Sequence, residues 1–247
     1  MNDPSADGPI RAVLLDIEGT TTPIAFVTEV LFPYARRHLR RYLEQHLASP
    51  AHGSLWARLR EEHETDHRLD PRVPEWSGSA QSSAEAIAAY VAWLMDRDRK
   101  STGLKELQGR IWEEGYARGD LVGDVFPDVP RALSRWRAEH RLACIFSSGS
   151  THAQQLLFKH SSAGDLTPYL TAYFDTTTGP KGEPASYRRI AESLNVASEA
   201  VVFVSDVTRE LDAARATGMR TRLAVRPGNP PAPASGHERL ISLDEIS

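Results

Sequence analysis

Short runs of apolar residues that each end at a polar residue constrain the fold of this chain more than any other feature. The runs lie at residues 11–16, 142–146, 200–204 and 220–225, with a weaker one at 171–174. A continuous apolar run of this length is typical of a strand buried on both faces. Helical spacing separates the later runs, at 128–140, 150–160, 184–194 and 207–217. This alternation predicts βαβ units and an α/β fold with a Rossmann-like parallel sheet.

Several residues mark where these elements begin and end. Ser150 is a suitable N-cap for the helix after the second run, and Gly218 a suitable C-cap for the helix at 207–217. Both residue types satisfy backbone groups that a helix end leaves unpaired. We expect the last residues, 239–246, to return to the edge of the sheet.

Residues 24–123 follow a different pattern, with apolar side chains at helical spacing and no strand-like run. Pro33 is expected to kink or divide the first of these helices. A loop of this length without structure of its own would be improbable. The sequence therefore predicts an α/β core made of residues 1–23 and 124–247. An all-helical domain, 24–123, is inserted between its first and second strands.

Composition excludes several classes of protein. Of 247 residues, 40% are hydrophobic and 25% are charged, which is ordinary for a globular chain that buries a core. The net charge of −4 argues against binding of nucleic acid through its phosphates. We expect no signal peptide and no membrane span, because the N-terminus is polar and the apolar runs are short. One cysteine allows no intrachain disulfide, which favours a reducing, cytoplasmic location. The single cysteine, Cys144, lies mid-strand and is expected to be buried.

Acidic residues follow the first strand, in the segment LLDIEGTTTP. Asp16 and Glu18 are two residues apart, so an extended chain would project both to the same side. Gly19 then lets the chain turn away. Two carboxylates this close repel each other unless a cation lies between them, and oxygen ligands suit Mg²⁺. The alternative is a plain strand-to-turn junction with solvated acids.

Three more segments place polar groups at strand ends. Ser147 and Ser148 precede a helix N-terminus, which favours a phosphate. Lys181 lies in a Gly-Pro-Lys-Gly turn and supplies a compact positive charge. Asp206 ends the fourth strand, and Glu210 follows one helical turn later. Each feature alone has a structural explanation, but together they hold what phosphoryl transfer requires: a nucleophile, a metal site and a phosphate cradle.

The order of these motifs resembles the haloacid dehalogenase superfamily. The resemblance implies that Asp16 is a nucleophile and that Ser147 is the hydroxyl of the second motif. It likewise implies that Lys181 is the catalytic lysine, that Asp206 and Glu210 are the acids of the fourth motif, and that 24–123 is a helical cap. The superfamily usually has aspartate where this chain has Glu18. That glutamate, with the segments IFSSGS, TTTGPKGEPASY and FVSDVTRELDAAR, looks like the enolase-phosphatases of methionine salvage.

This closer resemblance implies a two-step reaction. The substrate, 2,3-diketo-5-methylthiopentyl-1-phosphate, is enolised and then dephosphorylated to an acireductone, 1,2-dihydroxy-3-keto-5-methylthiopentene. The expected enzyme is a monomer that binds one Mg²⁺ per chain. Its expected partner is a small phosphorylated diketone, the substrate, and we expect it to bind neither nucleic acid nor a membrane. The implied metal ligands are Asp16, Glu18 and Asp206, supported by Glu210, and the implied substrate contacts are Ser147, Ser148 and Lys181. The implied catalytic residues are Asp16, Glu18 and Lys181.

Other interpretations of the sequence stay open beside this one. A one-step phosphatase of another small metabolite would carry the same motifs. His63 and His67 match the zinc-protease pattern H-E-x-x-H, but their charged flanks indicate a solvated helix end. Arg36, Arg37, Arg40 and Arg41 form a basic cluster, which is interpreted as a solvated helix face; the net charge of −4 favours this over the alternative of RNA binding. Aromatic residues of the inserted domain are expected mostly in its core, with one or two available to the substrate's methylthio tail.

Overall fold

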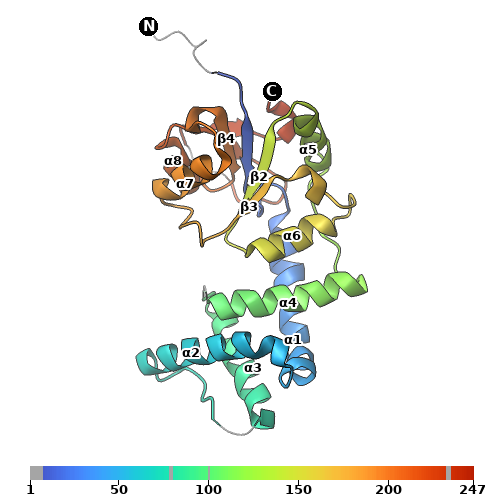
Figure 1. Ribbon diagram of the computed structural model, residues 1–247, viewed down its shortest axis with the longest axis vertical. Coiled ribbons are helices and arrows are strands. Elements are labelled where there is room, and N and C mark those ends of the chain that lie inside the picture. The colour runs from blue at the N-terminus through green and yellow to red at the C-terminus, as the bar shows by residue number, and fades with distance from the viewer. Residues whose placement is uncertain (1–7, 78–79, 100, 232–234) are drawn as a thin grey trace. The chain divides into compact units, whose positions relative to one another are not determined.

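The computed structural model describes residues 8–77, 80–99, 101–231 and 235–247 (Figure 1). The chain divides into two compact units, Met1–Val27 with Val122–Ser247 and Thr28–Leu121. Every strand of the described residues belongs to the first unit, and the second is helical. None of the described helices combines the length and the apolar character that crossing a membrane requires.

The first unit is built on a six-stranded sheet in the order β3-β2-β1-β4-β5-β6. All neighbouring strands are parallel, which confirms the predicted fold class. The strands are β1 (Ala12–Leu15), β2 (Leu142–Phe146), β3 (Ala172–Phe174), β4 (Val201–Ser205), β5 (Arg220–Ala224) and β6 (Glu238–Leu240). Strand β6 brings the end of the chain back to the sheet edge, as expected from the sequence.

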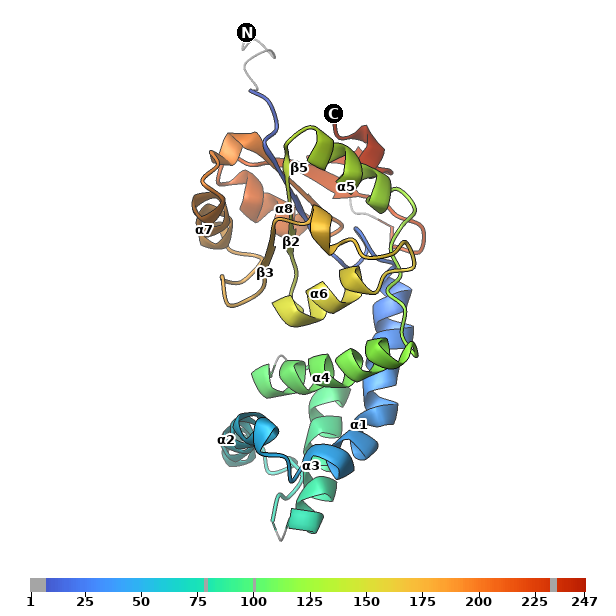
Figure 2. The same ribbon diagram turned by 45° about the vertical axis from the view of Figure 1, so that its right-hand side comes forward.

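Helices cover both faces of this sheet, which explains why its central strands are continuously apolar. They are α5 (Val129–Ala138), α6 (Thr151–Lys159), α7 (Pro184–Leu194) and α8 (Thr208–Arg215). Helices α7 and α8 lie on one side and α5 on the other (Figures 1 and 2). Alternate strand residues such as Leu14, Phe146 and Phe203 pack with Tyr187 and Leu211 from α7 and α8. Short 3₁₀ turns occur at Thr167–Tyr169, Ser198–Ala200 and Leu243–Glu245.

The two predicted helix caps have different outcomes. Ser150 is the N-cap of α6, where its hydroxyl accepts the N–H of Ala153 at 3.3 Å, as predicted. The prediction for Gly218 is wrong, because α8 ends at Arg215 with Ala216 as its C-cap. The backbone tightens there into short turns, with the N–H of Gly218 donating to the Arg215 carbonyl. Gly218, at φ +91°, adopts a left-handed conformation only after the helix has ended.

The described residues of the second unit form four α-helices and no strand. They are α1 (Phe32–His46), α2 (Gly53–Leu69), α3 (Ala80–Asp96) and α4 (Thr102–Arg118), with a 3₁₀ turn at Pro50–His52. A π-helical stretch, Phe26–Leu31, precedes α1, and Pro33 lies in the first turn of α1. Proline is tolerated there because the first N–H groups of a helix lack intrahelical partners. The buried face of α1 follows the predicted spacing at Tyr34, Ala35, Leu39, Tyr42 and Leu43.

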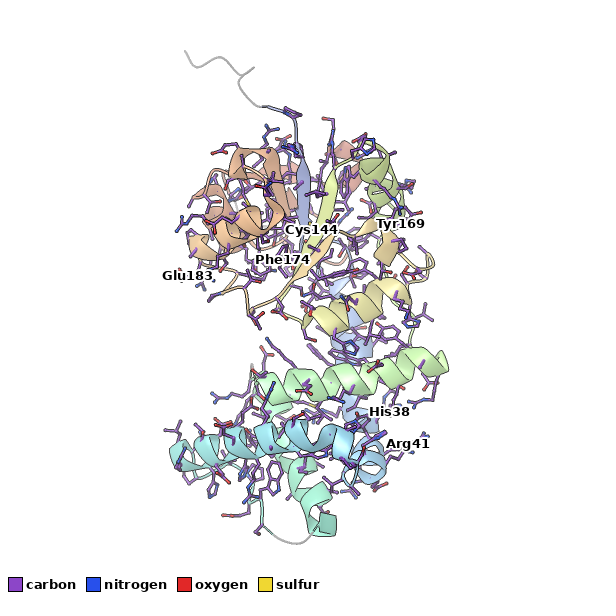
Figure 3. All side chains as sticks on the ribbon, in the orientation of Figure 1. His38, Arg41, Cys144, Tyr169, Phe174 and Glu183 are labelled. Carbon is purple, nitrogen blue, oxygen red and sulfur yellow. The ribbon has the colours of Figure 1, made fainter. Side chains whose placement is uncertain are left out.

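Cys144 lies within the sheet on β2 (Figure 3), where its side chain is inaccessible to solvent. Burial raises the pKa of its thiol to about 12. A thiol of this kind is protonated at neutral pH and is a poor nucleophile, because the thiolate is the reactive form. The expectation that Cys144 is a small core residue is confirmed.

Candidate active site

The register of the sheet brings the first and fourth motifs to one edge. Leu15, the last residue of β1, pairs with Val204 of β4. The N–H of Asp16 then donates to the Val204 carbonyl at 3.0 Å. Asp16 therefore leaves the sheet beside Ser205 and Asp206. In open α/β sheets, ligands bind beyond the carboxyl ends of the strands, and this is such a place.

Lys181 joins two buried carboxylates at this edge. Its Nζ lies 2.6 Å from Oδ1 of Asp16 and 2.7 Å from Oε2 of Glu210. The three side chains are 10%, 7% and 15% exposed, respectively. Burial alone would lower the pKa of Lys181, but the charges of Asp16 and Glu210 outweigh it and raise the pKa. The lysine therefore holds its positive charge against the Asp16 carboxylate.

Backbone and hydroxyl contacts fix this cluster in place. The Ser186 and Tyr187 hydroxyls of α7 donate to the carbonyls of Pro180 and Lys181, at 2.8 and 2.7 Å, which hold the lysine turn. Ser205 accepts the N–H of Val207 at 3.1 Å and lies 3.1 Å from Oε2 of Glu210. Helix α7 and strand β4 thus orient the lysine and its second carboxylate.

Asp206 lies against Gly19, where the chain turns after β1. Gly19 has φ +68°, and a Cβ at this residue would collide with the Asp206 carboxylate. Burial, together with the charges of Asp16 and Glu210, raises the pKa of Asp206 to about 7. Burial and the charge of Asp16 also raise the pKa of Glu210. These shifts indicate an excess of negative charge that a bound cation would relieve.

The donor chemistry at this edge fits Mg²⁺. Among the residues that the structure describes, no three histidine, cysteine, aspartate or glutamate side chains are grouped to hold a metal ion. Mg²⁺ does not require such a cage, since it usually takes one or two carboxylates and completes its shell with waters and substrate phosphate oxygens. Asp16 and Asp206 supply carboxylates of this type. Glu18 lies half-buried in the same loop, and its place in a three-ligand set stays a prediction.

The predicted phosphate turn, residues 147–149, lies at the end of β2, the other neighbour of β1. Ser147 is buried, and its hydroxyl accepts the N–H of Gly149 at 3.2 Å. Gln154 of α6 is 1% exposed and donates to the carbonyls of Gly149, at 2.8 Å, and Phe174, at 2.9 Å. Figure 3 labels Phe174 at the end of β3. Gln154 therefore ties the turn to the neighbouring strand.

The structure joins several predicted residues and adds others. Lys181 contacts both Asp16 and Glu210 directly. Asp206 is close enough for the charges of these two acids to raise its pKa. Sequence reasoning assigned no role to Ser205 or Gln154. Ser205 directly precedes Asp206 at a strand end, which was an available indication. A glutamine inside an amphipathic helix gives none.

The chain matches the haloacid dehalogenase-like hydrolase family over residues 10–218. It is 49% identical to the enolase-phosphatase E1 of Synechococcus elongatus over 239 residues, which cover 96% of this chain and 98% of the relative. The chain belongs to the enolase-phosphatase E1 family of haloacid dehalogenase-like hydrolases. The resemblance carried by Glu18 and the four motifs is thereby confirmed at the level of the family.

Solved structures show the same fold for this enolase-phosphatase family member. The UTR4 protein of Saccharomyces cerevisiae is 32% identical, with a TM-score of 0.76, and the match covers 96% of this chain and 100% of that one. The putative hydrolase YfnB of Bacillus subtilis, solved bound to magnesium, shares the fold at 15% identity with a TM-score of 0.55. The match to YfnB covers 97% of this chain and 97% of the YfnB chain.

The structure corrects the interpretation of the H-E-x-x-H motif for His63 and agrees with it for His67, which lies in the last turn of α2 with its side chain 38% exposed. His63 is not at a solvated helix end but is 4% exposed inside α2. Its ring packs against Trp76 and Tyr90, and its Nε2 lies 2.8 Å from the Pro74 carbonyl. An aromatic surface and a carbonyl partner hold His63 as a core residue. No metal-holding group includes it among the described residues.

The basic cluster on α1 is partly neutralised within its own unit. Arg36 forms an ion pair with Asp96, and Arg40 forms a longer one with Glu85 at 3.5 Å. All four side chains of these pairs are more than 45% exposed. Pairs of this kind are typical of a solvated helix face, which favours that interpretation over RNA binding.

Proposed function

We propose that this chain converts 2,3-diketo-5-methylthiopentyl-1-phosphate to an acireductone in two steps, an enolisation and then hydrolysis of the phosphate ester. The observation that carries the proposal is the buried contact between Asp16 and Lys181, at the strand end where the family places its nucleophile. Membership of the enolase-phosphatase E1 family supports the choice of substrate. The reaction belongs to the methionine salvage pathway, as the family resemblance implies.

The residues of the chain suit the phosphatase step. A carboxylate oxygen of Asp16 attacks phosphorus and forms an acyl phosphate, while the P–O bond of the ester breaks and the acireductone leaves as its conjugated enolate. Water then hydrolyses the acyl phosphate and regenerates Asp16. The Lys181 ammonium and the turn at Ser147 and Ser148 offset the charge of the phosphoryl oxygens. Such preorganised charge supplies most of the acceleration in phosphoryl transfer.

We further propose one Mg²⁺ per chain, held by Asp16, Glu18 and Asp206, with Glu210 supporting them through Lys181 and Ser205. When bound, the ion supplies positive charge and Lewis acidity at the phosphoryl and keto oxygens. The excess negative charge around Asp206 supports this assignment. Asp16 and Asp206 are the residues whose surroundings argue for it most directly.

Glu18 is proposed to act in enolisation. Its side chain is one methylene longer than the aspartate usual in the superfamily. We propose that this reach lets Glu18 ligate the metal or relay the enolisation proton. A Glu18→Asp variant should therefore lose enolisation or metal affinity. A variant that keeps both at the wild-type level would contradict the role.

The helical unit, Thr28–Leu121, is proposed to be the cap of the family. Phe32, an aromatic residue of this unit, is 40% exposed. Apolar side chains of this kind suit a thioether, since sulfur packs favourably against aromatic rings.

We propose that the protein is a monomer, as the family resemblance implies, and analytical ultracentrifugation tests this directly.

The Asp16→Asn variant tests the proposed chemistry. It should lower phosphate release by at least about 10³-fold, because the nucleophile is lost. Asp124→Asn, a change at an exposed aspartate of the same unit, is the matched control and should retain full activity. If Asp16→Asn still accumulates the enolised phosphate, the two steps use different residues. Phosphate release at the wild-type rate would overturn the assignment of Asp16.

A further inference from the structure

Two side chains from the turn after β5 hold the loop after β1. The turn, residues 226–229, is closed by the N–H of Asn229, which donates to the Arg226 carbonyl at 3.1 Å. Nδ2 of Asn229 donates to the Gly19 carbonyl at 2.8 Å, and Nε of Arg226 donates to the Thr20 carbonyl at 2.9 Å. Two successive carbonyls of the loop that begins at Asp16 are therefore bound from one turn.

Several hydrogen bonds within the loop converge on one carbonyl. The N–H groups of Thr20, Thr21 and Thr22 all point at the Ile17 carbonyl, at 3.2, 3.0 and 2.9 Å. A carbonyl oxygen has two lone pairs, so three donors that share one carbonyl cannot all form full-strength hydrogen bonds. Two further bonds lie within the loop: the N–H of Gly19 donates to the Thr22 carbonyl at 2.8 Å, and the Thr21 hydroxyl donates to the Asp16 carbonyl at 3.1 Å. Contacts from outside fix the loop against the rest of its unit: Asn229 and Arg226 bind the carbonyls of Gly19 and Thr20, and the N–H of Phe126 donates to the Thr21 carbonyl at 2.9 Å.

Arg226 is a fixed anchor for this contact. Its side chain is 3% exposed, and Nη1 lies 2.7 Å from Oδ2 of Asp128. The same nitrogen donates to the Ile241 carbonyl at 2.9 Å, and the guanidinium carbon lies 4.8 Å from the centre of the Phe126 ring. An arginine held on so many sides has little freedom to move. The turn that it begins is correspondingly rigid.

Asn229 also lies beside the site itself. A Cβ at Gly19 would come within 3.0 Å of Nδ2 of Asn229 and would collide with the Asp206 carboxylate. The two side chains therefore cover the same side of Gly19. A shift of the Gly19 carbonyl away from Asn229 would also change the space that Asp206 occupies. The turn at 226–229 is thus linked to Asp206 as well as to Asp16.

We propose that Asn229 and Arg226 are positioning residues that set the spacing between the carboxylates of Asp16 and Asp206. They act through the carbonyls of Gly19 and Thr20. For the identity of the reaction, the inference rests on the proposed function. Misplacement of catalytic groups by about 1 Å can lower rates by about 10²-fold, so this kind of support has a measurable effect.

Asn229→Ala is the informative variant, since Arg226 cannot be removed without leaving the buried Asp128 without its charged partner. Thr217→Val is the matched control, because it removes a half-buried side-chain bond to a carbonyl, at 2.7 Å, at the end of α8. Hydrogen exchange of the amides at 19–22 should accelerate about tenfold in Asn229→Ala and stay unchanged in Thr217→Val. This readout requires neither substrate nor metal.

Steady-state kinetics complete the test. Asn229→Ala should lower kcat about 10-fold to 100-fold, the range for residues that orient metal ligands. KM should change little, because the turn at Ser147 is untouched. Asn229→Asp should lower kcat further, since a carboxylate cannot donate to the Gly19 carbonyl and repels Asp206. Thr217→Val should match the wild type.

Three results would overturn the inference: unchanged exchange at 19–22, faster exchange with an unchanged kcat, or a change in KM alone. Failure of the proposed function gives a different pattern. The wild type would then hydrolyse p-nitrophenyl phosphate but not the diketone phosphate. Exchange and kcat on the aryl ester would still decide the role of Asn229.

Discussion

Gly19 is the residue at which backbone conformation and site chemistry meet most closely. Its φ of +68° costs a residue with a Cβ about 1–2 kcal/mol, and that Cβ would also collide with the Asp206 carboxylate. Gly19→Ala should therefore destabilise the protein by more than the backbone cost alone. It should also weaken Mg²⁺ binding about tenfold or more, because Asp206 must move. Urea denaturation and calorimetric titration with Mg²⁺ measure the two effects.

Gly164→Ala separates the backbone cost from the collision. Gly164 has φ +90° in the same unit, and a Cβ there meets nothing within 4 Å. This control should show the backbone cost and unchanged Mg²⁺ binding. Equal effects of the two substitutions on both measurements would contradict a special contact between Gly19 and Asp206.

Cys144 gives a second prediction for a single residue. With a thiol pKa of about 12 and no solvent exposure, it should resist a maleimide or a disulfide reagent at pH 8. One thiol per chain should react after denaturation, in agreement with the single cysteine of the sequence. Rapid labelling of the native protein would show that β2 opens readily or that the thiol lies elsewhere.

The turn after β5, residues 226–229, gives a prediction for the stability of the protein. Arg226→Ala leaves Asp128 buried without its charged partner, which should cost about 3–5 kcal/mol in the free energy of unfolding. The double change Arg226→Met with Asp128→Leu should recover only part of this. No charge is then left unpaired, but the N–H of Leu243 and the carbonyls of Thr20 and Ile241 lose their partners. Urea denaturation compares the three proteins. A single variant as stable as the wild type would show that the buried pair is unimportant.

Elements of the core were predictable where pattern and burial agree. The strands at β2 and β5, and helix α7, follow directly from apolar runs and helical spacing. Gly218 failed as a helix cap because the end of α8 tightens before it, and a local pattern cannot show that. His63 was misjudged because its aromatic neighbours, Trp76 and Tyr90, come from other segments of the chain.

The site was predictable in part for the same physical reason. Asp16, Lys181 and Asp206 follow strands or turns, and parallel strands bring their carboxyl ends to one edge. Gln154, Arg226 and Asn229 act through backbone carbonyls of distant segments. Such contacts depend on the folded path of the chain, which residue types and spacing do not reveal.

At the scale of the whole molecule, metal binding should appear as stability. A ligand that binds only the folded state adds RT ln(1 + [L]/Kd), which is about 2.7 kcal/mol at a hundredfold excess over Kd. Mg²⁺ should therefore raise the Tm of the wild type in a concentration-dependent way. The Asp206→Asn variant should lose this rise, because it lacks one carboxylate. A Tm that Mg²⁺ leaves unchanged in the wild type would contradict the proposed ion site.

The most direct measurement follows the diketone phosphate and its products in time, with Mg²⁺ and with EDTA. The wild type with Mg²⁺ should build up the enolised phosphate, seen by the absorbance of its conjugated enol, before free phosphate appears. EDTA should suppress phosphate release. Free phosphate formed without a preceding enol would indicate a one-step phosphatase. Equal phosphate release in EDTA would contradict the role given to Asp16 and Asp206.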